Sequence, residues 1–509
     1  MVQQAYQIIL DKPVYTDASV EYTPLLYAPS FFYLSALNIL IFGKSLFAVR
    51  LISIASIFLL IIVVYKLYRI IFYSFSEPVK IFALILSIGL FLACYKATLF
   101  WLDLAKVDSL FLFFIATSLY FFIYIIKKES ETVVLAILFA IFSSLLFFTK
   151  QTGIFIGLST PFVLWFFQKK KSAIIFSITF LLLTSGFMLF FNFSDTASKY
   201  FLYNIELPST HPLKIQPDMK KEFFSSFTPS LFALVLLLVL FLIHYLKRKI
   251  SSIKELYYEL LDYDVVIIFI YFIIVNFLIS FAGRLKLGAV ANSWLYYYFV
   301  VSLFSSYIGT SILFSLPIKE SKLFKNKVLQ IVLILLILGQ YFTLRYDSFE
   351  KINEITQNHK KNAEYTDLLC KLEQPVLFPT NPYLTNMYCG TRSSYLAQAV
   401  QDTMGHGEQF SLFFNSYKKA IENRDYKTIL EHKYYPESQI NAALKYTQSL
   451  IDLNQNKKDI HFYIIFQKAL ELQKLTQKYY TLKKDDELNI YEKQFKELNP
   501  GIHILKPNM

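Results

Sequence analysis

Residues 106–150 read KVDSLFLFFIATSLYFFIYIIKKESETVVLAILFAIFSSLLFFTK, and this stretch decides the class of fold. It contains two long apolar runs, 109–127 and 132–149, joined by a connection that begins with Lys127 and Lys128. A helix needs about 20 predominantly apolar residues to cross a bilayer, and local thinning of the bilayer accommodates shorter runs. The stretch therefore predicts two consecutive membrane-spanning helices.

The same pattern extends over most of the chain. With 509 residues, 55% hydrophobic side chains and a mean hydropathy of +0.44, the composition is typical of an integral membrane protein. Apolar runs of suitable length lie at 48–72, 79–100, 109–127, 132–149, 153–168, 172–192, 229–246, 263–282, 292–315 and 328–344. We therefore expect an α-helical polytopic protein with about ten spanning helices.

The net charge of +13 is unevenly distributed along the chain. Lysines and arginines collect in every second connection, at 66–80, 127–128, 169–171, 247–254 and 319–327. Because basic connections face the cytoplasm in membrane proteins, the other connections are expected to face outward. This bias accounts for the positive charge, and no nucleic-acid partner is expected.

The alternation of charge also predicts the domains. The apolar segment 24–43 has prolines in its first turns and precedes a span that must run inward. We expect it to be a helix lying in the outer interface, with an ordinary spanning helix as the alternative. Residues 1–47 then form a first extracytoplasmic loop with a juxtamembrane helix, 48–345 a polytopic domain, and 346–509 a small extracytoplasmic α/β domain.

Within the tail, four segments are expected to be strands: PVLFPT (375–380), HFYIIF (461–466), ELNIYE (487–492) and IHILKP (502–507). The segments 410–432 and 437–454 have helical periodicity. Cys370 and Cys389 can pair in this domain, a question that the sequence leaves open.

Charged and amide side chains gather in the connections expected to face outward. They are Tyr15, Asp17, Glu21, Asp103, Lys106, Asp108, Lys150, Gln151, Arg284, Lys286 and Asn292. Outward cations beside membrane helices run against the usual bias, and an anionic ligand at the membrane surface accounts for them. An aspartate that opens a span, as Asp108 does, is also a routine helix cap, so this reading stays open.

Cations beside carboxylates suit sugar transfer from a lipid-phosphate donor. A phosphate leaving group needs positive charge as the sugar departs, and an acceptor hydroxyl or amine needs a carboxylate to take its proton. We therefore predict that the donor phosphate is bound by Lys106, Lys150, Arg284 and Lys286. Catalytic carboxylates are expected among Asp17, Glu21, Asp103 and Asp108, and substrate-binding residues among Tyr15, Gln151, Asn292 and His211.

Neither a metal ion nor a cofactor is expected. The four candidate carboxylates could hold a metal ion if they converged, but the nearby lysines can supply the positive charge without one.

Several stretches resemble motifs of the integral-membrane glycosyltransferases of the GT-C fold. The closest resemblance is to the protein O-mannosyltransferase and aminoarabinose-transferase-like superfamily (glycosyltransferase 39/83-like). Residues 12–54 resemble its first outer loop, juxtamembrane helix and following span, and three stretches resemble its later outer-loop motifs: KVDSLFLFF (106–114), FTKQTG (148–153) and LKLGAVANSWLYYY (285–298). The tail segment LTQKYYTLKKDDELNIYEK (475–493) resembles the outer end of many members.

The resemblance implies a many-helix fold with an outward cavity, a polyprenyl-phosphate sugar donor and inversion at the anomeric carbon. It also implies a catalytic acid, usually in an Asp-Glu pair, just before AYQIILDKPVY (5–15). No acid stands there, so the usual acid is expected upstream of Met1, with Asp17 and Glu21 as substitutes. Lys106 stands where the family often has arginine, which keeps the charge but loses the planar fork.

The sequence thus predicts a hexosyl- or pentosyltransferase in a bacterial cytoplasmic membrane. Its partners would be the polyprenyl-phosphate sugar donor, membrane lipid, and an unknown acceptor (lipid, glycan or protein) on the outer face. A transporter or flippase is an alternative, although it would predict mid-membrane charges and an internal repeat, which are not evident. A polymerase or ligase of lipid-linked glycans is another, and a non-catalytic scaffold is a third if the first-loop acid is absent.

Overall fold

The structure is a computed structural model that describes most of the chain. The described residues are 1–94, 98, 101–102, 104–128, 133–193, 199–210, 264–286, 291–314, 364, 366–378, 389, 394, 399, 402–403, 407–431, 437–453, 460–498 and 502–508. The spans expected at 229–246 and 328–344 lie outside these residues.

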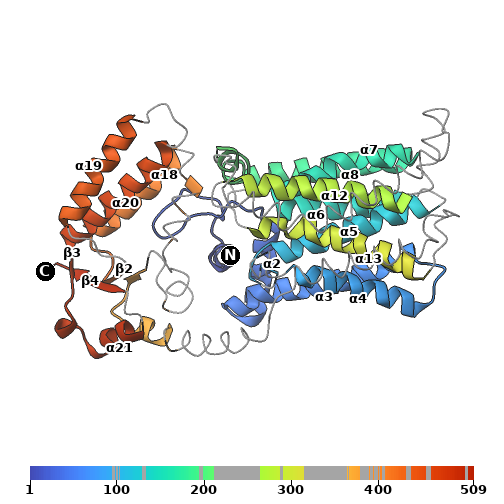
Figure 1. Ribbon diagram of the computed structural model, residues 1–509. Helices are drawn as coiled ribbons and strands as arrows, with labels where there is room; N and C mark the ends of the chain where they lie inside the picture. The colour runs from blue at the N-terminus through green and yellow to red at the C-terminus, as the bar shows by residue number, and fades with distance from the viewer. Residues whose placement is uncertain are drawn as a thin grey trace.

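A bundle of apolar helices forms one half of the described structure (Figure 1). The helices are α3 (Leu46–Ile71), α4 (Glu77–Ala93), α5 (Asp108–Lys127), α6 (Val133–Thr149), α7 (Ile154–Phe166), α8 (Lys170–Phe193), α12 (Asp264–Leu285) and α13 (Leu295–Leu313). A helix satisfies its backbone hydrogen bonds internally, which a lipid environment requires. Helix α5 contacts α3, α6 and α12, and most of its side chains are buried. The expected helical fold is confirmed.

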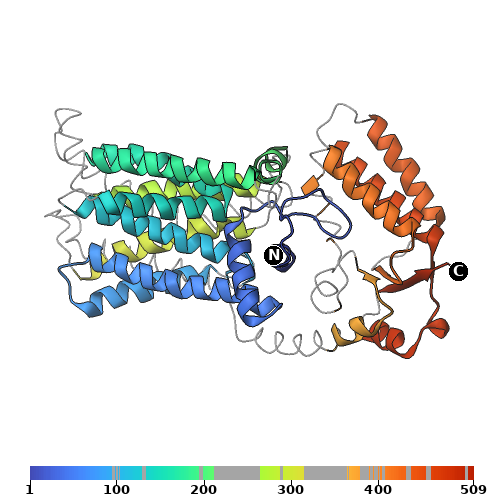
Figure 2. The same ribbon diagram turned by 180° about the vertical axis from the view of Figure 1, so that it is seen from behind.

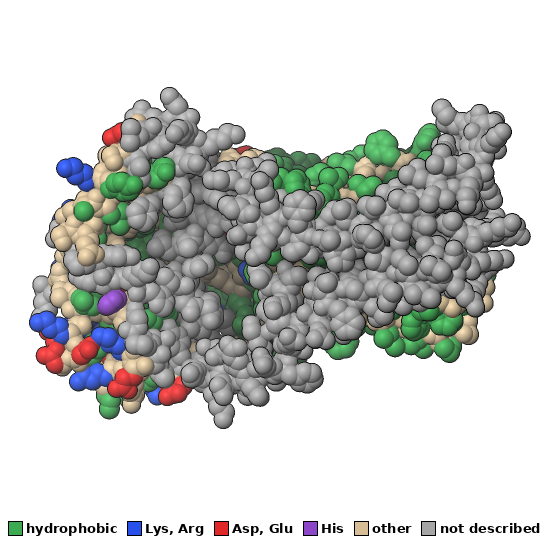
Figure 3. All heavy atoms as spheres, viewed as in Figure 1, with side chains coloured by type: hydrophobic (Ala, Val, Ile, Leu, Met, Phe, Trp, Pro, Cys, Tyr) green, Lys and Arg blue, Asp and Glu red, His purple; other side chains and the backbone are tan. Residues whose placement is uncertain are grey.

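The outer surface of the bundle is suited to contact with lipid. Among the described helices, α3, α5, α8 and α12 are long and apolar enough to cross a membrane, while α6 and α7 are apolar but shorter. Large hydrophobic side chains are exposed on the bundle, such as Phe162 at 77% and Leu182 at 69%. Figure 3 shows hydrophobic side chains along its visible edges, whereas charged side chains gather on the C-terminal domain. Exposed apolar surface of this extent marks a membrane-facing region.

The charged side chains of the connections lie at the two opposite ends of the bundle. At the end far from the C-terminal domain, Lys127 pairs with Asp264 at 2.8 Å, and the Lys169 ammonium donates to the Lys128 carbonyl at 2.6 Å. Asp108 opens α5 at the other end. The basic connections that the structure describes therefore share one end, as the alternation of charge predicted.

The N-terminal segment lies at the end of the bundle that faces the C-terminal domain. It contains α1 (Val2–Ile9) and α2 (Ser30–Phe42), which pack against each other. Helix α2 runs across this end rather than along the bundle (Figure 2), and it stops at Gly43, whose φ of +80° favours glycine. The segment 24–43 therefore contains a helix that crosses one end of the bundle, and its position in the membrane interface stays a prediction.

The C-terminal part is a small α/β domain, as expected. Its sheet has the order β1 (Val376–Leu377), β2 (Thr428–Glu431), β4 (His503–Pro507) and β3 (Tyr480–Leu482). Strand β1 is parallel to β2, and the other two pairings are antiparallel. The helices are α18 (Gly407–Glu422), α19 (Glu437–Leu453), α20 (Ile460–Tyr479) and α21 (Ile490–Leu498).

The sheet separates two apolar cores. Successive strand residues point to opposite faces, so Ile429 and Leu505 enter one core while Leu430 and Ile504 enter the other. The first core also contains Ala18 and Val20 of the first loop. The loop is thus part of the C-terminal domain's own packing.

Two of the four expected strands are wrong. HFYIIF (461–466) lies in α20, because a short apolar run cannot be distinguished from a helix by periodicity alone. ELNIYE (487–492) leads into α21, where Asn489 accepts from Tyr491 N and Glu492 N, and Glu492 accepts from Asn489 N. These reciprocal bonds form a helix start. The segment 410–432, expected to be helical throughout, contains both α18 and β2.

PVLFPT (375–380) and IHILKP (502–507) do contain strands, β1 and β4. Cys370 and Cys389 form a disulfide with their Cα atoms 4.8 Å apart. The pairing that the sequence left open is therefore made in the structure.

Candidate functional site

Asp108, Lys150 and Tyr296 meet at the end of the bundle that faces the C-terminal domain. The Tyr296 hydroxyl donates to Asp108 Oδ1, and the Lys150 ammonium lies 3.4 Å from the same oxygen and 2.5 Å from the Tyr296 hydroxyl. The side chains of Asp108 and Lys150 are 3% and 19% exposed. A carboxylate this deeply buried needs a cation and a hydrogen-bond donor, and it has both.

Three separate connections bring this cluster together. Asp108 opens α5, Lys150 stands between α6 and η1 (Gln151–Gly153), and Tyr296 lies in the first turns of α13. Phe111, one turn into α5, packs edge-to-face against the Tyr296 ring with the centroids 4.7 Å apart. The Tyr296 hydroxyl is therefore held toward Asp108.

Asp108 does not occupy the cap position of α5. The cap position of α5 is Val107, and it makes no side-chain cap hydrogen bond. The recorded side-chain bonds of Asp108 go instead to Lys150 and Tyr296. A charge in the first turn still interacts favourably with the helix dipole, but its partners come from other helices.

Lys106 and Lys286 lie within electrostatic reach of this cluster. Burial lowers the pKa of Lys106, and the negative charges of Asp108 and Asp402 oppose this shift. Burial and the nearby Lys150 lower the pKa of Lys286, and Asp402 opposes that shift too. Burial therefore disfavours the charged form of both lysines, and the nearby carboxylates favour it.

The chain around Lys106 is fixed by a neighbouring helix. The Ser53 hydroxyl of α3 donates to the carbonyls of Leu104 and Lys106, at 2.6 and 3.2 Å. Arg284, the remaining expected phosphate ligand, is 3% exposed in the last turn of α12, two residues before Lys286. We therefore define the lysine site as Lys106, Lys150 and Lys286 with Asp108 and Tyr296.

No sequence pattern marks Asp402 or Tyr296 as part of this site. Asp402 belongs to the C-terminal part, is 7% exposed, and influences the pKa values of both Lys106 and Lys286. Its sequence context carries no signal, because only folding brings it to the bundle. Tyr296 stands in a run of aromatic residues at the start of a span, which reads as an ordinary membrane interface.

The first-loop acids have other partners. Asp17 pairs with Lys199 and accepts from the Gln409 amide at 2.8 Å. Partial burial raises the pKa of Asp17, but the hydrogen bonds from Gln409 and Lys199 outweigh this effect and hold it below its usual value. Glu21 is exposed, and its carbonyl accepts from Gln3.

The expected substrate-binding residues are distributed more widely. Tyr15 is 1% exposed and donates to the Tyr27 carbonyl at 2.7 Å, so it belongs to the core of the loop. Gln151 donates to Asn204 at 2.9 Å and to the Leu26 carbonyl. Asn292 is half-buried in η3 (Ala291–Trp294), before α13. Asp103 and His211 lie outside the described residues.

The lysine site has the charge that an anion requires. Among the residues that the structure describes, no group of three or more His, Cys, Asp or Glu side chains could hold a metal. Three lysines with the two carboxylates Asp108 and Asp402 leave net positive charge, which suits a phosphate at the membrane surface.

Comparison with known proteins gives structural matches only. No family model and no curated protein sequence matches the chain. ArnT from Cupriavidus metallidurans, solved with undecaprenyl phosphate, matches with a TM-score of 0.44 and 11% identity over 84% of this chain and 86% of that one. Its apo structure matches with the same TM-score and 13% identity.

A third match is the archaeal oligosaccharyltransferase AglB from Archaeoglobus fulgidus, solved with an inhibitory peptide and a dolichol-phosphate. Its TM-score is 0.40, with 13% identity over 81% of this chain and 62% of that one. ArnT and AglB are both membrane glycosyltransferases of the GT-C fold, the group that the sequence motifs resemble.

Proposed function

We propose that the protein is a membrane glycosyltransferase that moves a sugar from a polyprenyl-phosphate donor to an acceptor on the outer face of the membrane. The observation that carries this proposal is the lysine site itself. Lys106, Lys150 and Lys286 come from three connections at one end of an apolar bundle. Lys150 is paired with the buried Asp108, and the other two lysines lie within electrostatic reach of this cluster. A lipid phosphate presents its anionic group at this level of the membrane.

The lysines act on the leaving group. As the bond between the anomeric carbon and the phosphate oxygen breaks, its electron pair remains on the phosphate, and nearby ammonium groups stabilise this charge. Partial desolvation strengthens the interaction, because water competes less for both partners. Asp108 and Tyr296 hold Lys150 in place for this role.

The acceptor oxygen or nitrogen forms the new bond to the anomeric carbon and gives up its proton. A carboxylate near the lysines is needed to take it. Asp402 lies within electrostatic reach of Lys106 and Lys286, whereas Asp108 is paired with Lys150. Asp402 is therefore our first candidate for the base, with Asp103 and the first-loop acids Asp17 and Glu21 kept as the alternatives.

The orientation in the membrane belongs to the same proposal. The described basic connections lie at the end far from the C-terminal domain, which supports a cytoplasmic assignment for that end. The Cys370–Cys389 disulfide supports an oxidising compartment for the C-terminal domain. Residues 1–47 and 346–509 would then be extracytoplasmic, on either side of a polytopic domain at 48–345.

The test is sugar transfer by the full chain in lipid vesicles, with a labelled polyprenyl-phosphate sugar and a cell-envelope extract as the acceptor source. We expect Lys106→Met, Lys150→Met and Lys286→Met to weaken donor use by about 1–3 kcal/mol each, the usual size for a lost charged hydrogen bond. Lys66→Met, at the exposed far end of α3, is the matched control. Normal sugar transfer by all three variants would show that these lysines do not bind the donor phosphate.

A further inference from the structure

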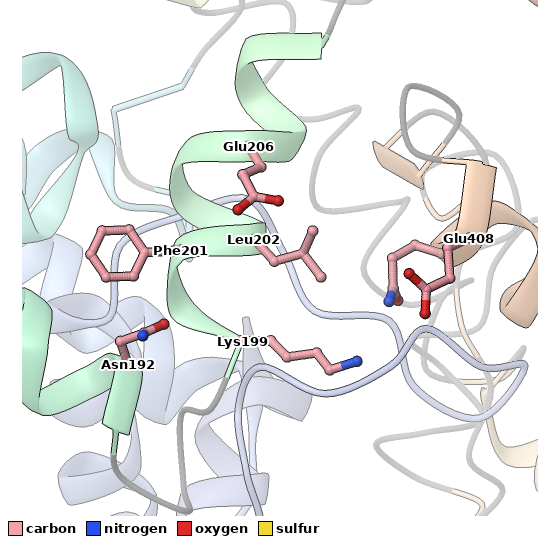
Figure 4. Close-up of a pocket in the computed structure, with 7 residues that line it drawn as sticks. Asn192, Lys199, Phe201, Leu202, Glu206 and Glu408 are labelled. Atoms are coloured by element: carbon pink, nitrogen blue, oxygen red, sulfur yellow. The ribbon is translucent and has the colours of Figure 1, made fainter.

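A second, chemically different site lies between the outer end of the bundle and the C-terminal domain. It is a pocket of about 480 Å³. Its polar and apolar lining includes Asn192, Lys199, Leu202, Glu206, Glu408 and Gln409. Figure 4 shows Lys199 and Leu202 extending from one wall toward Glu408 on the other, with Glu206 beside them. We call it the Glu206–Glu408 pocket.

The lining has the chemistry that a carbohydrate requires. Sugar hydroxyls both donate and accept hydrogen bonds, carboxylates accept strongly, and an amide such as that of Asn192 does both. Leu202 adds an apolar surface for the C–H face of a sugar ring. A pocket of this volume has room for a short saccharide of about two rings.

The charge of the pocket is opposite to that of the lysine site. Glu206 and Glu408 are exposed carboxylates, while the single lysine of the lining, Lys199, is already paired with Asp17. A phosphate would meet like charge here, which is unfavourable. A neutral or amine-bearing sugar is not repelled by these carboxylates.

One short helix connects the two sites. The π-helix η2 (Leu202–Glu206) supplies Leu202 and Glu206 to the pocket. Its Asn204 accepts from Gln151, the neighbour of Lys150, and its Tyr203 donates to Gln409 at 3.2 Å. Single turns of π-helix recur at functional sites, and this one couples the pocket wall to the chain that carries Lys150.

We propose that the Glu206–Glu408 pocket binds the acceptor, and that the acceptor is a neutral or amine-bearing saccharide. This inference rests on the proposed function and narrows it from an open choice among lipid, glycan and protein. The donor phosphate goes to the lysines, and the acceptor sugar goes to the carboxylates. Opposite charge thus keeps the two substrates in separate sites.

The probe is an array of immobilised neutral, amino and phosphorylated saccharides together with Ser/Thr-containing peptides. The labelled full chain in detergent should bind neutral or amino saccharides. Leu202→Trp, which fills the pocket, and the double variant Glu206→Gln/Glu408→Gln should each weaken this binding about tenfold, as expected for losing a charged hydrogen bond or its site. Glu422→Gln, at the opposite end of α18, is the matched control and should bind normally.

Equal binding by the pocket variants, preference for phosphorylated saccharides or peptides, or no binding to any saccharide would overturn the inference. A second measurement, the binding of a fluorescent polyprenyl phosphate, tests the proposed function separately from the acceptor pocket. That binding should survive Leu202→Trp and be weakened by Lys106→Met. If Lys106→Met binds the polyprenyl phosphate normally, the result counts against the proposed function, whatever the array shows.

Discussion

At the scale of single residues, Asp108 is the side chain on which the lysine site depends. Its carboxylate is shared by a lysine and a tyrosine that come from different connections. Removing the charge leaves the ammonium of Lys150 without its counter-ion in a largely buried place, which is costly. A substitution of Asp108 can therefore affect both folding and the proposed sugar transfer, and a test must distinguish these two effects.

We expect Asp108→Asn to insert and fold but to lose sugar transfer at least about tenfold, equivalent to 1.4 kcal/mol in the barrier. The amide keeps the size of the side chain but no longer balances Lys150. Asp264→Asn is a matched control, because Asp264 opens α12 and pairs with Lys127 at the opposite end. Full transfer by Asp108→Asn would leave this residue with a role at the helix start only.

The lysines also predict a pH dependence. Burial lowers the pKa of Lys106 and Lys286, so each loses its proton at a lower pH than an exposed lysine. Donor binding needs the protonated ammonium groups, so it should be complete at a pH below these pKa values. It should fall as the pH rises through them, at a lower pH than the pKa of about 10.4 of an ordinary lysine. The measurement is polyprenyl-phosphate binding as a function of pH.

Arginine substitution supplies the control for this pH dependence. Lys106→Arg and Lys286→Arg keep their charge throughout, so together they should move the fall to higher pH. A fall at the same pH in the double variant would show that another group is responsible.

At the scale of elements, the first loop is held by α18. The Gln409 side chain accepts from Ala18 N at 3.0 Å and donates to Asp17, while the Ser416 hydroxyl accepts from Val20 N at 2.9 Å. The loop backbone thus obtains partners from a helix almost 400 residues away in sequence. This contact ties the position of the C-terminal domain to that of the loop.

We expect Gln409→Ala to release the loop, with a loss of about 1–3 kcal/mol because a buried amide and its partners lose their hydrogen bonds. Hydrogen exchange should rise at the amides of residues 14–23. Gln448→Ala, an exposed glutamine of α19, should leave that exchange unchanged. Unaltered protection in Gln409→Ala would mean that the loop holds its conformation without α18.

At the scale of the whole molecule, the two ends of the bundle differ in their neighbours, because one of them faces the C-terminal domain. Reporter fusions at residues 200 and 400 should both report the extracytoplasmic side, and one at residue 128 the cytoplasm. The physical reason is the basic residues at the far end, which resist translocation. A cytoplasmic report from residue 400 would separate the C-terminal domain from any outer-face site.

The sequence by itself determined the bundle, because apolar runs of spanning length admit helices and few alternatives. It also named Lys106, Asp108, Lys150 and Lys286 from their connections, and these residues lie at the end of the bundle that faces the C-terminal domain. It did less well in the tail, where HFYIIF and ELNIYE were taken as strands. There, short apolar runs are ambiguous, and the packing of α20 and the capping bonds of α21 decide between helix and strand.

The tertiary structure alone decided which polar residues become neighbours. Asp17 was expected as a substitute catalytic acid, but its recorded partners are Lys199 and Gln409, and Tyr15 lies within the core of the loop. The position of Asp402 near Lys106 and the formation of the Glu206–Glu408 pocket both require segments that lie about 200 residues or more apart in the sequence. Such contacts leave no local pattern, because spacing along a chain reports only on neighbours within the same helix or strand.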